Sequence, residues 1–320
     1  MNENIIRTIS SEMNRYLNNY QMSKLHEVLY KKLEVNNCEI SNDEYVIKFI
    51  NSKKLEGCSE LTIKNYKMHI NKMLLYLNKD IRTIETDDIR NFLSYYQSNN
   101  NCSNSTIDGV RRSLSSFFSF LENEDYIVKS PIKRIHKIKT EYIIKEIYSD
   151  EVMEKLRNSC TNIRNLAIID LLASSGMRIS ELVNLNIDDI NFENKSCVVF
   201  GKGKKMREVY FDSKAKLHIE EYLNSRTDNN KALFVSKNKP NKRLQSRGIE
   251  LMLQKLGKKI GEEKVYPHKF RRTLATNAID KGMPIEQVQH LLGHTKIDTT
   301  LHYAFVNQNN VKMSHRKYIC

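Results

Sequence analysis

The sequence predicts a mainly α-helical protein of two domains, with one small antiparallel β-hairpin in an α+β second domain. Apolar residues recur every three or four positions through most of the chain, which is the period of one helix face. Residues 196–211 differ, because two short apolar runs flank a glycine- and lysine-rich turn, as in a hairpin. The chain has 320 residues, more than a single core usually serves.

Residues 1–38 are expected to form a leader of two short amphipathic helices, with Ser23 capping the second. The two apolar stripes comprise Ile5, Ile6, Ile9 and Met13, and then Leu25, Val28, Leu29 and Leu33. The leader could contact DNA or a neighbouring subunit, or it could pack on the domain that follows. The sequence leaves these alternatives open.

Residues 39–130 predict a compact helical domain with four helices, the third capped by Thr86 and the fourth starting near Ser105. Two of the helices present basic side chains away from their apolar stripes. These candidate DNA-binding residues are Lys64 and Lys67 on the second helix and Arg111 and Arg112 on the fourth. Such faces suit phosphate groups, but they are also typical of an ordinary solvated surface.

Residues 131–148 predict a basic, extended and poorly packed linker between the domains. Residues 129–139 contain five basic and no acidic side chains, and Pro131 disfavours a continuing helix. Lys133 and Arg134 are candidate DNA contacts, so the segment suits a strap across a DNA backbone. An ordinary hydrophilic linker would have the same composition.

Residues 149–320 predict a mostly helical second domain that ends in a C-terminal tail. Ser149 is the expected cap of its first helix, and helices continue to about residue 192 with a break at Gly176. After the hairpin, helices resume with boundaries at Pro267, Gly282, Pro284 and Gly293. The turn Gly201-Lys202-Gly203 lacks the spacing of a nucleotide-binding loop, so no ATP site is predicted.

The formal charge of +14 favours a polyanionic partner, although lysines that merely solvate the surface would give the same value. No apolar run approaches the about 20 residues needed to cross a bilayer, and no signal peptide is recognisable. None of the six cysteines forms a Cys-x-x-Cys pair. We therefore expect a cytoplasmic protein without membrane association, disulfides, metal or cofactor.

Six residues form a candidate catalytic set for phosphoryl transfer: Arg178, Lys202, His268, Arg271, His294 and Tyr303. Guanidinium groups bind phosphate oxygens bidentately and offset the charge that builds up at a pentavalent phosphorus. Cations near a phenol lower its pKa from about 10 and make it a nucleophile. A histidine could accept the phenolic proton, and Lys202 could protonate the departing 5′-oxygen. Lys204 and Lys205 in the same turn are rivals to Lys202 and candidate DNA contacts.

His268 and Arg271 are three positions apart, so they are expected to project from one helix face towards solvent. Arg178 follows the break at Gly176, where a new helix begins. Its side chain and the nearby amides are expected to bind an anion together. A covalent 3′-phosphotyrosine would conserve the phosphodiester energy, so neither ATP nor a metal is required.

The ordered motifs Gly176-Met-Arg178-Ile-Ser-Glu-Leu182, Gly201-Lys202-Gly203, His268-Lys-Phe-Arg271, Leu292-Gly-His294 and Tyr303 resemble the tyrosine recombinase (phage integrase) family, especially Xer-like and simple integrases. The resemblance implies a SAM-like helical core-binding domain and a catalytic domain that form a clamp around DNA. It makes Tyr303 the nucleophile and Lys202 the general acid. It also implies phosphate binding by both arginines and His294, with His268 sharing in proton transfer.

The resemblance further implies a homo-tetramer on double-stranded DNA with specific recombination sites, formed from monomers or dimers. Phe305, Val306 and Val311 in the tail are expected to dock on a neighbouring protomer. The expected activity is integration or excision of a mobile element or phage, and the presence of the leader favours this activity. The alternatives are Xer-type resolution of chromosome dimers, a type IB topoisomerase and an inactive DNA-binding regulator. Topoisomerases of that type commonly carry lysine at the position of His268, which favours the recombinase.

Overall fold

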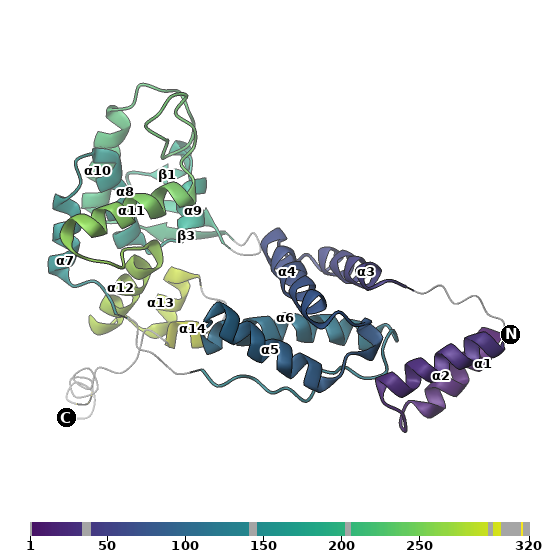
Figure 1. Ribbon diagram of the computed structural model, residues 1–320. Helices are drawn as coiled ribbons and strands as arrows, with labels where there is room; N and C mark the ends of the chain where they lie inside the picture. The colour runs from purple at the N-terminus through teal and green to yellow at the C-terminus, as the bar shows by residue number, and fades with distance from the viewer. Residues whose placement is uncertain are drawn as a thin grey trace. The chain divides into compact units, whose positions relative to one another are not determined.

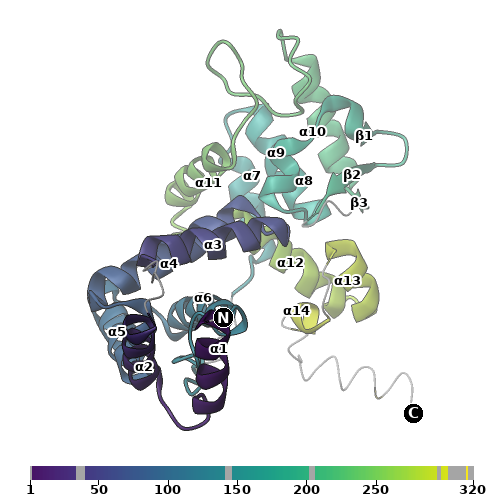
Figure 2. The ribbon, with the colours of Figure 1, turned by 90° about the vertical axis from the view of Figure 1, so that its right-hand side faces the viewer.

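The computed structural model describes residues 2–33, 40–140, 146–201, 206–293, 297–301 and 315. The chain forms two compact units, Met1–Tyr142 and Ile143–Cys320 (Figure 1, Figure 2). Each unit has a hydrophobic core of its own. The boundary between them falls inside the segment predicted to be a linker. Helices predominate in both units, and the described strands form one small sheet in the second unit. No helix in the described ranges has the length and apolar character needed to span a membrane.

The leader forms two helices, α1 (Asn2–Met13) and α2 (Asn19–Lys32), which pack side by side (Figure 1). The cap of α2 is Asn18, whose side chain accepts a hydrogen bond from the Gln21 amide at 2.8 Å, while the Gln21 side chain accepts one from the Asn18 amide at 3.0 Å. The prediction of Ser23 as the cap is therefore wrong, because this reciprocal capping box starts the helix five residues earlier.

The leader packs on the helical domain that follows it. Helix α2 contacts the short 3₁₀ helix η1 (Ile81–Thr83). The side-chain amide of Asn19 also exchanges two hydrogen bonds with the backbone of Lys129, at 2.7 and 3.0 Å.

Four helices form the remainder of the first unit: α3 (Asn42–Leu55), α4 (Glu60–Leu77), α5 (Thr86–Asn100) and α6 (Asn104–Asn123). Helix α6 is central, because it contacts the other three and buries Leu114, Phe117 and Phe118 completely. Thr86 is the first residue of α5 rather than its cap, since the preceding Glu85 amide donates to Asp88 at 3.0 Å. Helix α6 begins at Asn104, which confirms the predicted start near Ser105, and its cap is Ser103, whose hydroxyl accepts a hydrogen bond from the Thr106 amide.

The start of the linker is packed, which contradicts the expectation of a poorly packed segment for residues up to 140. Ile132 is buried, and Ile135 and Ile138 pack against the same hydrophobic core. The carboxylate of Asp108 on α6 accepts a hydrogen bond from the Ile138 amide at 3.2 Å. The backbone of the linker is thus attached to the first unit by side-chain contacts.

The second unit contains α7 (Asp150–Asn158), α8 (Ile163–Ser175), α9 (Ile179–Asn184), η2 (Ile187–Asp189), β1 (Ile190–Asn191), β2 (Ser196–Phe200), β3 (Met206–Tyr210), α10 (Ser213–Asn224), α11 (Ser246–Ile260), α12 (Pro267–Asp280), α13 (Ile285–Leu292) and α14 (Asp298–Leu301). Helix α8 lies in the core and contacts α10 and α12. The antiparallel pairing of β2 with β3 confirms the predicted hairpin, and β1 adds a third strand of two residues.

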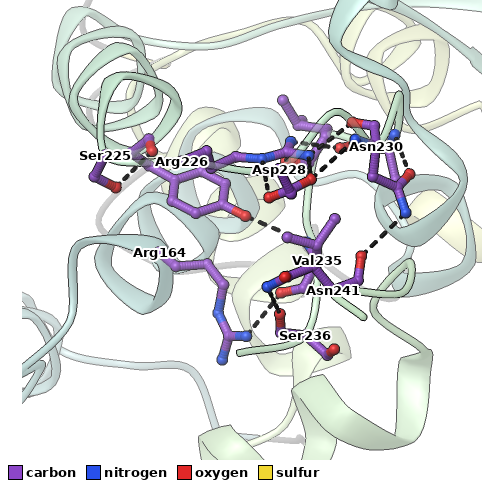
Figure 3. A network of polar contacts seen from close by, with 11 residues as sticks. Arg164, Ser225, Arg226, Asp228, Asn230, Val235, Ser236 and Asn241 are labelled. Carbon is purple, nitrogen blue, oxygen red and sulfur yellow. Dashed lines mark hydrogen bonds and ion pairs between the residues drawn. The ribbon is translucent and has the colours of Figure 1, made fainter. Parts of the chain in front are cut away.

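Arginine side chains organise the long connection between α10 and α11 (Figure 3). Arg226 donates to the carbonyl oxygens of Ala232 and Leu233, at 2.7 and 3.2 Å. Arg164 on α8 donates to the Val235 carbonyl at 2.8 Å. These bonds add to the two isolated β-bridges of the segment, Asn186–Ala232 and Val235–Arg243, and the Arg164 bond fixes the segment to α8.

We predict that Asp108→Ala frees the linker for proteolysis. Hydrogen bonds to a charged group contribute about 1.5–3 kcal/mol, so their loss should increase tryptic cleavage after Lys137 or Lys139 by about tenfold or more. Limited proteolysis of the full chain with mass spectrometry measures this. The matched control is Asp87→Ala, whose side chain is 81% exposed in its ion pair with Arg90. Equal cleavage of the two variants would contradict the role of Asp108.

Candidate active site

The break between α8 and α9 requires glycine. Gly176 ends α8 with a φ of +58°, and its amide donates to the Leu172 carbonyl at 3.1 Å. A Cβ at this position would lie 2.6 Å from Cδ2 of Leu274 on α12 and 3.3 Å from Cδ2 of Leu292 on α13. The turn therefore allows α12 and α13 to approach the start of α9, where Arg178 is located.

Arg271 is buried, with only 1% of its surface exposed, and links two segments of the backbone. Its Nη1 donates to the Gly176 carbonyl at 2.8 Å, and its Nη2 donates to the Leu292 carbonyl. The expectation that His268 and Arg271 both face solvent is therefore half wrong: His268 is exposed, whereas Arg271 is turned inward. Three residues on a helix subtend about 300°, so the two side chains can differ in burial although they are neighbours.

Arg178 meets Arg271 at the C-terminal end of α13. Its Nη2 donates to the Gly293 carbonyl at 3.4 Å, next to the Leu292 carbonyl that Arg271 uses. The Arg178 side chain is 34% exposed, and its Nη1 pairs with Glu181 at 2.9 Å. The structure thus brings together the two arginines predicted to bind phosphate, which are 93 positions apart in the sequence.

Glu181 is a buried carboxylate held by two arginines. It accepts Nη1 and Nη2 of Arg207 at 2.6 and 2.8 Å, Nη1 of Arg178 at 2.9 Å and the Arg178 amide at 2.7 Å. Burial alone would raise the pKa of Glu181, but the hydrogen bonds from Arg207 and Arg178 outweigh it and hold the pKa below its ordinary value. The carboxylate is therefore ionised at neutral pH.

The sequence analysis missed Glu181 and Arg207, and the structure corrects one expectation as a result. The amide at the start of α9, expected to bind an anion, is occupied by Glu181 itself. The strand pattern contains a signal for Arg207. It lies two positions before the buried Val209, so both side chains point to the inward face of β3. An arginine on such a face needs an acidic partner.

Three of the predicted catalytic residues, Lys202, His294 and Tyr303, lie outside the described residues, as do Lys204 and Lys205. Their positions in the chain are defined by their neighbours. Lys202 belongs to the connection between β2 and β3, and His294 directly follows the Gly293 that ends α13.

The predicted DNA-binding residues in the first unit differ in exposure. Lys64, Lys67, Arg112, Lys133 and Arg134 are exposed. Arg111 is not presented to solvent as expected, because its side chain is only 14% exposed and pairs with the buried Asp108 at 2.9 Å. Asp108 therefore both anchors the linker and holds this guanidinium against α6.

Comparison with known proteins gives the family. The model of the phage integrase family matches residues 145–310, and that of the phage integrase N-terminal SAM-like domain matches residues 46–127. The chain belongs to the phage integrase family. It is a tyrosine recombinase, an enzyme that breaks and rejoins DNA strands, with the helical fold expected of one.

Among curated relatives, the tyrosine recombinase XerC of Leptospira interrogans is 33% identical over 293 residues, covering 87% of this chain and 93% of the relative. XerC of Staphylococcus aureus is 32% identical over 278 residues, covering 82% and 92%. Two solved structures share the fold. The Tn1549 transposon integrase with circular intermediate DNA has a TM-score of 0.69 at 18% identity, covering 85% of this chain and 98% of that chain. XerH bound to a palindromic difH substrate has a TM-score of 0.68 at 22% identity, covering 89% and 92%.

We predict that Gly176→Ala destabilises the tyrosine recombinase more than Gly261→Ala does. Both glycines end helices of the second unit with positive φ, but nothing lies within 4 Å of a Cβ added at Gly261. The left-handed backbone should cost each variant about 1–2 kcal/mol. The clash with Leu274 should add about 1–3 kcal/mol at Gly176. Urea unfolding of the full chain measures both, and equal losses would show that α12 can move away from the turn.

Proposed function

We propose that this tyrosine recombinase is site-specific and cleaves DNA through a covalent bond between Tyr303 and a 3′-phosphate. The observation that carries the proposal is the convergence of Arg178 and Arg271 on the carbonyls of Gly293 and Leu292. Hydrogen bonds to the protein's own backbone orient both guanidinium groups, which is the condition for preorganised electrostatic catalysis. The exposed His268 lies on α12 one turn before Arg271.

In the proposed cleavage step, the phenolic oxygen of Tyr303 attacks the scissile phosphorus, and the bond from phosphorus to the 5′-oxygen breaks. His268 or His294 accepts the phenolic proton, and Lys202 gives a proton to the departing 5′-oxygen. Arg178 and Arg271 bind the non-bridging oxygens and offset their growing negative charge. Attack by the 5′-hydroxyl of a second strand reverses the chemistry and joins the strands without ATP.

The XerC relatives, which align over more than nine-tenths of their own length, favour Xer-type recombination between paired DNA sites. Integration or excision of a mobile element, which the sequence analysis put first, is the second candidate. Its support is the leader α1–α2 and the fold shared with a transposon integrase. In either role we infer a homo-tetramer on two duplexes. The positive surface side chains Lys64, Lys67, Arg112, Lys133 and Arg134 would contact the DNA backbone.

We predict that Tyr303→Phe abolishes covalent attachment to DNA, because removal of the hydroxyl removes the nucleophile. The substrate is a nicked duplex whose site the full-length protein has selected from a randomised DNA pool. Its nick lets the short cleaved fragment diffuse away and traps the adduct, which denaturing electrophoresis detects. Tyr210→Phe, an exposed tyrosine on β3, is the matched control and should form the adduct normally. An adduct formed by Tyr303→Phe would identify a different nucleophile.

A second prediction separates the recombinase from a type IB topoisomerase. Supercoiled plasmid without the selected site should stay supercoiled at a protein concentration that recombines plasmid carrying two such sites. The reason is that a site-specific enzyme gains its binding energy for cleavage from base contacts that random DNA lacks. Agarose gels follow both plasmids. Rapid relaxation of the plasmid without a site would favour the topoisomerase.

A further inference from the structure

Arg207 on β3 joins three segments that carry predicted catalytic residues. Its Nη1 and Nη2 bind both carboxylate oxygens of Glu181, at 2.6 and 2.8 Å, and Glu181 in turn binds Arg178. Its Nε donates to the Leu291 carbonyl near the end of α13 at 3.3 Å. Its own strand begins directly after the connection that contains Lys202.

We propose that Arg207 is a positioning residue for strand cleavage, which keeps Arg178 available to the scissile phosphate by neutralising Glu181. The inference depends on the proposed function, because it assumes that Arg178 binds this phosphate.

The charges at this point of the structure support the proposal. Glu181 has a 1% exposed side chain, and a buried carboxylate requires cationic partners. With Arg207 bound to both of its oxygens, one positive charge compensates the carboxylate and the charge of Arg178 remains for an anion. Without Arg207, the buried carboxylate would attract Arg178 more strongly and compete with the phosphate for it.

The geometry makes this role specific for arginine. A planar fork can bind both oxygens of a carboxylate and still donate from Nε, as Arg207 does to Leu291, whereas a lysine ammonium is a point charge. The stem of Arg207 also lies across the end of α13. A Cβ at Gly293 would be 2.8 Å from Cδ of Arg207 and 3.0 Å from its Nε. The same side chain thus fixes the backbone that Arg178 contacts.

The test measures single-turnover adduct formation on the selected nicked duplex, with either a normal scissile phosphate or a methylphosphonate there. A methylphosphonate replaces one charged oxygen by a methyl group, so it has less need of Arg178. Arg207→Met should cleave the phosphodiester about 100-fold more slowly, the usual effect of misplacing a catalytic group by about 1 Å. Arg207→Lys should lose at least about tenfold, since it keeps the charge without the fork. On the methylphosphonate, both variants should react within about threefold of the unsubstituted protein.

Arg247→Met is the matched control, because Arg247 pairs with Glu250 on the surface of the same unit with a 70% exposed side chain. It should cleave both substrates normally. Arg207 variants that cleave the phosphodiester normally would overturn the proposal. An equal loss of cleavage rate on both substrates would also overturn it, because it would indicate a general structural role. If Arg207→Met does not fold, the rates of Arg207→Lys on the two substrates decide between these outcomes. If the unsubstituted protein forms no adduct through Tyr303, the proposed function itself fails.

Discussion

The site depends on a buried arginine. Burying a guanidinium is unfavourable unless hydrogen bonds replace its water, and Arg271 finds these partners in backbone carbonyls from two different segments. The turn after α8 and the end of α13 must therefore both be in place before α12 can settle. Arg178 begins the helix that leaves this same turn, so its position follows from the burial of Arg271. The contacts that stabilise the second unit therefore also position its proposed phosphate-binding groups.

Next to Arg271, the charges of neighbouring side chains compensate one another through direct contacts. The ionised Glu181 lies between two arginines, and both of these also reach backbone carbonyls at the end of α13. Glu181 can orient Arg178 without neutralising its charge, because Arg207 supplies the positive charge that compensates the carboxylate. These contacts hold the partly exposed Arg178 side chain in an orientation that water alone would not maintain.

Periodicity and turn chemistry could predict most of the fold. The stripes of the four helices in the first unit, the hairpin around Lys202 and the glycine stops at Gly176 and Gly293 are local signals, and the structure contains all of them. What the sequence could not supply are pairings between distant side chains. Arg271 and Arg111 carry charge and look like surface residues, but their burial depends on partners that tertiary folding brings near.

The candidate site shows the same division. The spacing of the motifs predicts which arginines belong together. It does not predict Glu181, because an acidic residue is not an obvious member of a phosphate site, or Arg207, whose partner Glu181 is 26 positions away. The error in the cap of α2 arises because two nearby residues can both cap a helix. Asn18 and Ser23 are both acceptable helix caps, and only the reciprocal bonds with Gln21 decide between them.

The attachment of the leader to the first unit has a consequence for the order of folding. Asn19 binds the backbone of Lys129, which is 110 positions further along the chain. A ribosome releases α1 and α2 first. One of their docking partners, η1, follows after two helices of the unit, but the Lys129 backbone emerges only after all four have been synthesised. Contacts of such long range form late, since the entropy of closing the intervening chain must be offset first. The segment that is made first thus completes its docking only after the last helix of its domain has been synthesised.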